Sequence, residues 1–219
     1  MEIKQYTWDI VDSNSWLIEE GNHGLLIDAV DNAELYREIQ RLDDLTIILT
    51  HAHFDHIIGL NKIREEHHHT SVISTMKCSE YLGNVFRNMS ATANAFLEFY
   101  DGEIKRKIEP FTCEHADNIF EEKCEIGWHG YKILLEALHG HSADSLMVIF
   151  DGKYLFSGDS LLSIPTITRF PTGSSKLFCE EDIPRLKEMY YIREVFPGHG
   201  QSGNIKEMIE INQNIMKRE

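Results

Sequence analysis

Three histidines and an aspartate lie within a stretch of six residues, at His51, His53, Asp55 and His56. Neutral imidazole and carboxylate are ligands that zinc, iron and manganese accept in proteins. In an extended segment, side chains two positions apart point the same way, so His51 and His53 could coordinate one ion. Asp55 and His56, where the chain turns, are then free to face a second ion. This spacing indicates a metal site.

The elements around this cluster are predicted from hydrophobic periodicity. Residues 45–49 form an apolar run without polar alternation, as expected of a strand covered on both faces. Residues 55–66 carry apolar side chains at helical spacing, so we expect the cluster to lie on a strand-to-helix loop.

Three more candidate ligands follow other predicted strands. His141 comes after the strand at 131–138, and Asp159 and His199 follow two later short strands. Ligands at the ends of successive strands converge on one edge of a sheet structure, whereas randomly placed histidines would scatter. The recurrence predicts that all of these residues serve one site.

Strands and helices alternate along the chain, and no linker or repeat divides it, so we predict a single domain over residues 1–219. The dipeptide Asp151–Gly152 favours a tight hairpin. We expect a helix capped by Asp31–Asn32. The other expected strands are 3–10, 14–19, 23–28, 70–76, 146–150, 154–156 and 194–196; the other expected helices are 77–100, 180–192 and 205–216; residues 164–175 are expected to be a loop, and 104–108 and 119–125 strand or loop.

Composition narrows the class of protein. The chain has 219 residues, of which 42% are hydrophobic and 26% charged, as in ordinary globular proteins. Its formal net charge of −15 would repel nucleic acid and anionic membranes at long range. The N-terminus lacks a signal-peptide pattern, no window is long enough to span a membrane, and the four cysteines form no Cys-x-x-Cys pair. We therefore expect a cytoplasmic protein with reduced thiols, a small-molecule substrate and no nucleic-acid or membrane partner, and leave a homodimer open.

The ordered set His-x-His-x-Asp-His, Gly-His, Gly-Asp and Pro-Gly-His resembles the metallo-β-lactamase-fold hydrolases along the whole chain. Residues 157–162 are similar to a Gly-Asp segment of the glyoxalase II-like branch, and Arg169 resembles the arginine of a loop that trails it. The resemblance implies an α/β fold, the four-layer αββα sandwich, and substrate binding by Arg169. It also implies a first metal held by His51, His53 and His141, a second held by Asp55, His56 and His199, and a bridge between them at Asp159.

Two nearby divalent ions can share a water and lower its pKa to near 7, which supplies hydroxide at neutral pH. We expect that hydroxide to attack an activated carbonyl, with Asp55 as the catalytic residue that orients it and passes on its proton. The sequence has no Gly-x-Ser-x-Gly elbow and no local signature of a catalytic cysteine. The predicted function is therefore binuclear hydrolysis of a thioester or ester, with zinc preferred and iron or manganese as alternatives.

Two other functions remain open from the sequence. One is a mononuclear iron oxidoreductase similar to the persulfide dioxygenases on this scaffold, using His51, His53, His141 or a subset of them with Asp159. The other is a binding or regulatory protein that keeps the fold without turnover.

Overall fold

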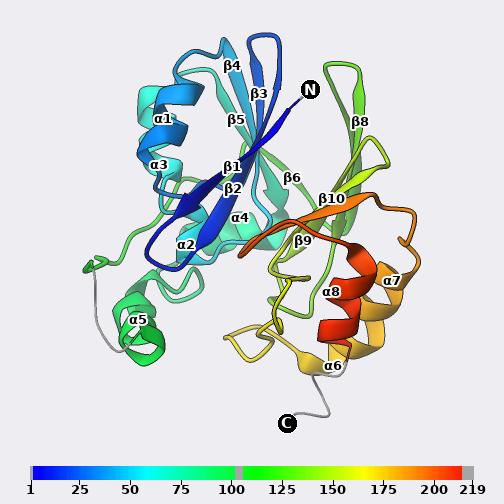
Figure 1. The fold of residues 1–219 in the computed structure, drawn as a ribbon. Helices are drawn as coiled ribbons and strands as arrows, with labels where there is room; N and C mark the ends of the chain where they lie inside the picture. Colours follow the sequence, from blue (N-terminus) through cyan, green and yellow to red (C-terminus); the bar gives the residue numbers. More distant parts are fainter. Residues whose placement is uncertain (1, 102–105, 214–219) are drawn as a thin grey trace. The chain divides into compact units, whose positions relative to one another are not determined.

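The computed structural model describes residues 2–101 and 106–213 (Figure 1). Its contacts divide the chain into two compact units, Met1–Ile119 and Phe120–Glu219. Each unit is built around one β-sheet. The single-domain organisation expected from the sequence stays a prediction.

The first sheet has six strands in the order β1-β2-β3-β4-β5-β6. The first three strands form an antiparallel meander, and β3, β4 and β5 run parallel. The buried strand expected at 45–49 is confirmed as β4, and Ile47 and Ile48 are fully buried. The strand bounds are β1 Ile3–Trp8, β2 Ser13–Glu20, β3 His23–Ile27, β4 Asp44–Ile48, β5 Thr70–Thr75 and β6 Asn118–Phe120.

Helix α1 begins where the sequence places its cap. The Asn32 side chain accepts hydrogen bonds from the backbone N–H groups of Glu34 and Leu35, which satisfies two of the otherwise unpaired donors of the first turn. Figure 1 shows α1 and α3 side by side against the sheet. The helices of this unit are α1 Ala33–Ile39, α2 Phe54–Ile57, α3 Leu60–Glu66, α4 Met76–Leu82 and α5 Ala93–Asp101, with a 3₁₀ turn at Ser90–Thr92.

The single helix expected over 55–66 is wrong, because the chain breaks at Gly59 into α2 and α3. The Gly59 N–H donates to the Ala29 carbonyl at 2.8 Å, and a Cβ at this position would lie 2.4 Å from the Val30 carbonyl oxygen. The backbone therefore passes too close to the segment after β3 for any side chain, and α2 is left as a short separate helix that carries two of the candidate ligands.

The helical segment expected over 77–100 is also interrupted. Residues 83–89 lie outside regular helix, and Met89 has a left-handed backbone with φ 63°. Of residues 104–108, the first two lie outside the described residues and 106–108 form no strand. The stretch 119–125 contributes to β6 and to the start of β7.

The second sheet has five strands in the order β11-β10-β9-β8-β7. Strands β10 and β11 are parallel and the other neighbours antiparallel. The expected hairpin is confirmed, since Asp151 and Gly152 both have positive φ, 50° and 63°, as the two central residues of a type I′ turn require. The strands are β7 Lys123–Trp128, β8 Tyr131–Ala137, β9 Leu146–Phe150, β10 Tyr154–Gly158 and β11 Glu194–Pro197.

The helix expected at 180–192 begins earlier and ends earlier. Ser174 caps it, because its side chain accepts the Leu177 N–H, and residues 188–192 form a turn that places Met189 and Ile192 in the core. Figure 1 shows α7 and α8 side by side in this unit, and α6 leads through η2 into α7. The bounds are α6 Ser175–Leu177, a π-helical turn η2 Phe178–Asp182, α7 Ile183–Lys187 and α8 Ile205–Asn212.

The prediction that α8 continues to residue 216 reaches beyond the described residues, which stop at 213. Among the helices of residues 2–101 and 106–213, none combines the length and the apolar character that crossing a bilayer requires.

Candidate metal centre

Side chains that could hold a metal ion follow strand ends in each unit. Strands β3 and β4 are parallel, so the residues after them share one edge of the first sheet. The ends of β8, β10 and β11 likewise share one edge of the second sheet, because β8 and β10 are each antiparallel to β9, and β10 is parallel to β11. The first unit supplies His51, His53, Asp55 and His56, and the second supplies His141, Asp159 and His199.

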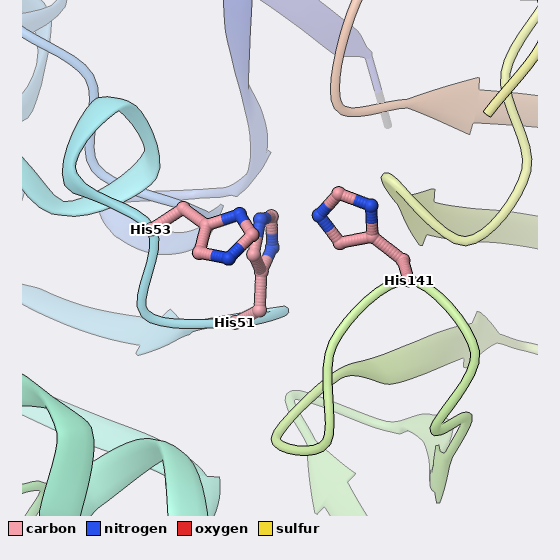
Figure 2. Close-up of side chains that lie close together, drawn as sticks. All are labelled: His51, His53 and His141. Atoms are coloured by element: carbon pink, nitrogen blue, oxygen red, sulfur yellow. The ribbon is translucent and has the colours of Figure 1, made fainter. Parts of the chain in front are cut away.

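The four candidates of the first unit lie together. The ring centroid of His51 is 4.5 Å from that of His53 and 4.3 Å from that of His56. Figure 2 shows His51 and His53 on the same loop with their rings adjacent. His53 is the N-cap of α2, whereas Asp55 and His56 lie within that helix, so the strand-to-helix transition gives each side chain its direction. The loop prediction is confirmed for His51 and His53, whereas Asp55 and His56 already belong to α2.

Asp28, directly after β3, organises the back of this cluster, a role that was not predicted from the sequence. Its Oδ1 accepts the Thr50 N–H at 2.7 Å, and its Oδ2 accepts the Thr50 hydroxyl at 2.7 Å and lies 3.0 Å from Nδ1 of His56. The Thr50 hydroxyl oxygen in turn lies 3.1 Å from Nδ1 of His51. The only sequence signal for Asp28 is an acidic residue immediately after an apolar strand.

These contacts assign the imidazole tautomers. Because a carboxylate can only accept, Nδ1 of His56 donates to Asp28. The Thr50 hydroxyl gives its proton to Asp28 and therefore accepts from Nδ1 of His51. Both imidazoles are then left with Nε2 as the nitrogen that carries a lone pair, the form in which histidine binds a metal.

Replacing Asp28 by Asn tests this arrangement. Asn tolerates the positive φ of 61° found at position 28, so the backbone should be retained. The carboxamide nitrogen cannot accept, however, and one of the three donors loses its partner. We expect metal affinity to fall by about 10- to 100-fold, as for other residues that orient metal-binding histidines. Chelator competition measures it.

Asp12→Asn is the matched control, since Asp12 also has a positive φ, 56°, but is exposed. Equal metal affinity in the D28N and D12N variants would contradict the role of Asp28.

In the second unit, a carboxylate lies between two imidazoles. Oδ2 of Asp159 is 3.6 Å from Nε2 of His141 and 3.4 Å from Nε2 of His199. The ends of β10 and β11 are held together, because Gly198 N–H donates to the Gly158 carbonyl at 2.8 Å. The structure therefore brings together all three candidates of this unit.

The His141 ring is oriented by the loop that follows β10. Its Nδ1 lies 2.7 Å from the Ile167 carbonyl oxygen, which can only accept, so Nδ1 carries the proton and Nε2 the lone pair. The Phe170 ring packs edge-on against the imidazole, with centroids 5.8 Å apart. Figure 2 draws His141 at the loop after β8.

A similar contact occurs in both units and fits a cation. The lone pair of His56 Nε2 lies 3.5 Å from Oδ2 of Asp55, and that of His141 Nε2 lies 3.6 Å from Oδ2 of Asp159. Neither distance is that of a hydrogen bond. Two acceptors that face each other in buried surroundings repel, and a divalent ion coordinated by both atoms would remove that repulsion. The donor set therefore suits a metal.

Asn212, on α8, supports the loop that carries Asp159. Its side-chain oxygen accepts the Thr166 N–H at 2.6 Å, and its nitrogen donates to the carbonyls of Leu162 and Met208, each at 2.8 Å. Asn212 is completely buried. These bonds fix the chain from Leu162 to Thr166 against α8.

Asn212→Ala should therefore destabilise the protein by about 1–3 kcal/mol, because the Thr166 N–H and the Leu162 carbonyl lose their partner inside the protein. We expect the denaturation midpoint in urea to fall in N212A. Gln213→Ala, at the exposed neighbouring position, should change it little. A midpoint equal in both variants would show that the Asn212 hydrogen bonds carry no stability.

Arg169, the predicted substrate contact, lies in the loop 163–174 that also contains Phe170, and its side chain is exposed. That position leaves its proposed contact with substrate a prediction. Sequence reasoning missed Asp28, Thr50 and Asn212, whose roles rest on hydrogen bonds to distant parts of the chain.

Comparison with known proteins gives the family. The model of the metallo-beta-lactamase superfamily matches residues 8–192. The chain belongs to this superfamily, whose members bind divalent metal ions, and the fold class predicted from the sequence is confirmed.

Two curated relatives are hydrolases by name. A probable metallo-hydrolase of Streptococcus pyogenes is 26% identical over 94% of this chain and 86% of its own length. A hydroxyacylglutathione hydrolase of Actinobacillus pleuropneumoniae is 21% identical over 86% of this chain and 66% of its own length. Among solved structures, the B3 metallo-beta-lactamase BLEG-1 superimposes with a TM-score of 0.80 at 24% identity, over 96% of this chain and 98% of that one. The relatives support an enzyme of the metallo-hydrolase type.

Proposed function

We propose that this protein hydrolyses a thioester or another activated ester with two divalent metal ions, zinc in the first instance. The assignment follows the ligand pattern of the superfamily, and it requires the two units to bring their side chains to a common centre. His51, His53 and His141 would hold the first ion, Asp55, His56 and His199 the second, and Asp159 would bridge them.

The facing acceptors described above carry this proposal. His56 with Asp55, and His141 with Asp159, each place a nitrogen lone pair opposite a carboxylate oxygen at 3.5–3.6 Å. Such pairs lie in both units. His56 and Asp55 are both assigned to the second ion, whereas His141 is assigned to the first ion and Asp159, which also lies 3.4 Å from Nε2 of His199, to the bridge. This distribution supports two ions better than one.

The bound ions would supply an activated water and polarise the carbonyl of the substrate. Asp55, buried in the first turn of α2, is the residue of this chain that would orient that water, accept its proton and pass it to the leaving thiolate. A thiolate leaves without a strong general acid, so a thioester suits a site in which one carboxylate must handle the proton.

Two of the four cysteines, Cys78 and Cys113, are buried and poorly suited to act as nucleophiles. Burial raises the pKa of the Cys113 thiol to about 12, so it stays protonated at neutral pH. Cys78 is completely buried. Among the described residues, an acyl-enzyme route through these two thiols is therefore not supported.

The relative named hydroxyacylglutathione hydrolase supports a thioester in particular, but this chain covers 66% of its length. We therefore propose the acyl-thioester class and leave the thiol part of the substrate open. Arg169 is proposed as a contact for an anionic group of that substrate, on the strength of its exposure beside Phe170.

Metal content tests the proposal first. Protein purified without chelator or affinity tag should contain nearly two divalent ions per chain by elemental analysis, and it should hydrolyse a generic thioester. Removal of the metal should abolish that activity and readdition should restore it. A single iron per chain, with oxygen consumed in the presence of a persulfide, would replace the hydrolase with the oxidoreductase alternative.

Asp55→Ala tests the role of the carboxylate. We expect kcat for the thioester to fall by about 10²- to 10⁴-fold, the usual contribution of a positioned acid or base, while at least one metal ion stays bound. Asp9→Ala, at an exposed turn, is the control and should keep full activity. Full activity in D55A would exclude the proposed role.

A further inference from the structure

Asp182 is a buried carboxylate for which the proposed chemistry has no use. Its side chain is 2% exposed and lies at the end of the π-helical turn η2, in which Phe178 is also buried. Residues four apart lie on the same face of a helix, so both side chains point into the protein. Phe178 belongs to an apolar cluster with Leu138 and Leu161, and Asp182 brings a polar group to its border.

The contact of Asp182 is the backbone immediately before His141. Its Oδ2 accepts the Gly140 N–H at 2.8 Å. A Cβ on Gly140 would lie 2.5 Å from that oxygen and 2.5 Å from Cα of Phe178, so the turn η2 leaves no room for a side chain there. The Gly140 carbonyl accepts the Ser174 N–H at 2.8 Å. Both backbone polar groups of Gly140 are thus held by the segment 174–182.

Electrostatics make this contact costly. Burial raises the pKa of Asp182 to about 6, although the N–H groups of Gly140 and His139 and the charge of the His139 imidazole act to lower it; the neighbouring Glu181 raises it further. A carboxyl whose pKa is higher in the folded than in the unfolded state lowers the stability of the folded protein as pH rises between those two values, here from about 4 to about 6. At neutral pH the ionised Asp182 therefore lowers stability.

We propose that Asp182 is a positioning residue for His141, which by accepting the Gly140 N–H fixes the loop that aims this imidazole at the metal. The inference deepens the proposed function, and it rests on metal binding by His141. A charge-assisted bond to a backbone N–H is stronger than a neutral one, and it holds the peptide that enters His141 in one orientation.

The Asp182→Asn substitution should lower metal affinity without lowering the melting temperature of the metal-free protein. The variant removes the buried charge, so the metal-free protein should melt at the same or a higher temperature at pH 7.5. The neutral amide holds Gly140 less firmly, so metal affinity should fall by about tenfold in chelator competition, as for other residues that orient metal ligands. Glu181→Gln removes a charge from an exposed neighbour that also repels ionised Asp182; it should leave metal affinity unchanged and should not lower the melting temperature.

Unchanged metal affinity in D182N would overturn the inference, as would a loss of affinity accompanied by a lower melting temperature of the metal-free protein. The latter is what a merely structural role would give.

Nuclear magnetic resonance of the metal-free protein separates this inference from the proposed function. In the wild type, the amide signal of Gly140 should shift with pH as Asp182 titrates, and D182N should abolish that shift; a shift of equal size in both proteins would overturn the inference. D182N should also shift the ring signals of His141 more than those of His199, and equal shifts would overturn it. Both measurements hold even if the wild type binds no metal, a result that would overturn only the proposed function.

Discussion

The carboxylate of Asp28 is the contact on which the first unit's metal-binding groups depend. It accepts from Thr50 twice and from His56, and through Thr50 it also orients His51. Parallel pairing of β3 and β4 brings Asp28 to the edge where the chain leaves β4, so the sheet topology creates the contact. A buried carboxylate is costly unless its oxygens are satisfied, and here three donors satisfy them. The same bonds leave Nε2 of both imidazoles as the ligand atom.

In the second unit, polar groups from helices and loops orient the candidate metal ligands. His141 is held by the Ile167 carbonyl through its ring and by Asp182 through the preceding peptide, while Asn212 holds the chain after Asp159. Asp182 and Asn212 are buried and their side chains pair with backbone groups, whereas the Ile167 carbonyl pairs with the imidazole itself. Loop conformation is thereby fixed by specific hydrogen bonds where regular secondary structure ends.

The candidate ligands and most strands were predicted from the sequence alone, because they depend on local patterns. The histidine spacing at 51–56 and the apolar run of β4 are visible within one window. The break at Gly59 was missed, since it comes from close packing on the segment after β3, thirty residues earlier in the chain. Asp28, Asp182 and Asn212 were missed for the same reason: each contacts partners more than twenty residues away, and a single polar residue gives no periodic signal.

The two units differ in whether local secondary structure or distant contacts orient their candidate ligands. His53, Asp55 and His56 are the cap and first turn of α2, so helical geometry sets their relative directions once the helix forms. His141 stands in the connection between the antiparallel strands β8 and β9, where no helix fixes it. Its direction depends on contacts with segments 26 and more residues further along the chain, which in turn rely on the packing of η2, α7 and α8. Substitutions in the core formed by those helices should therefore change the direction of His141 before they change the directions of the ligands of the first unit.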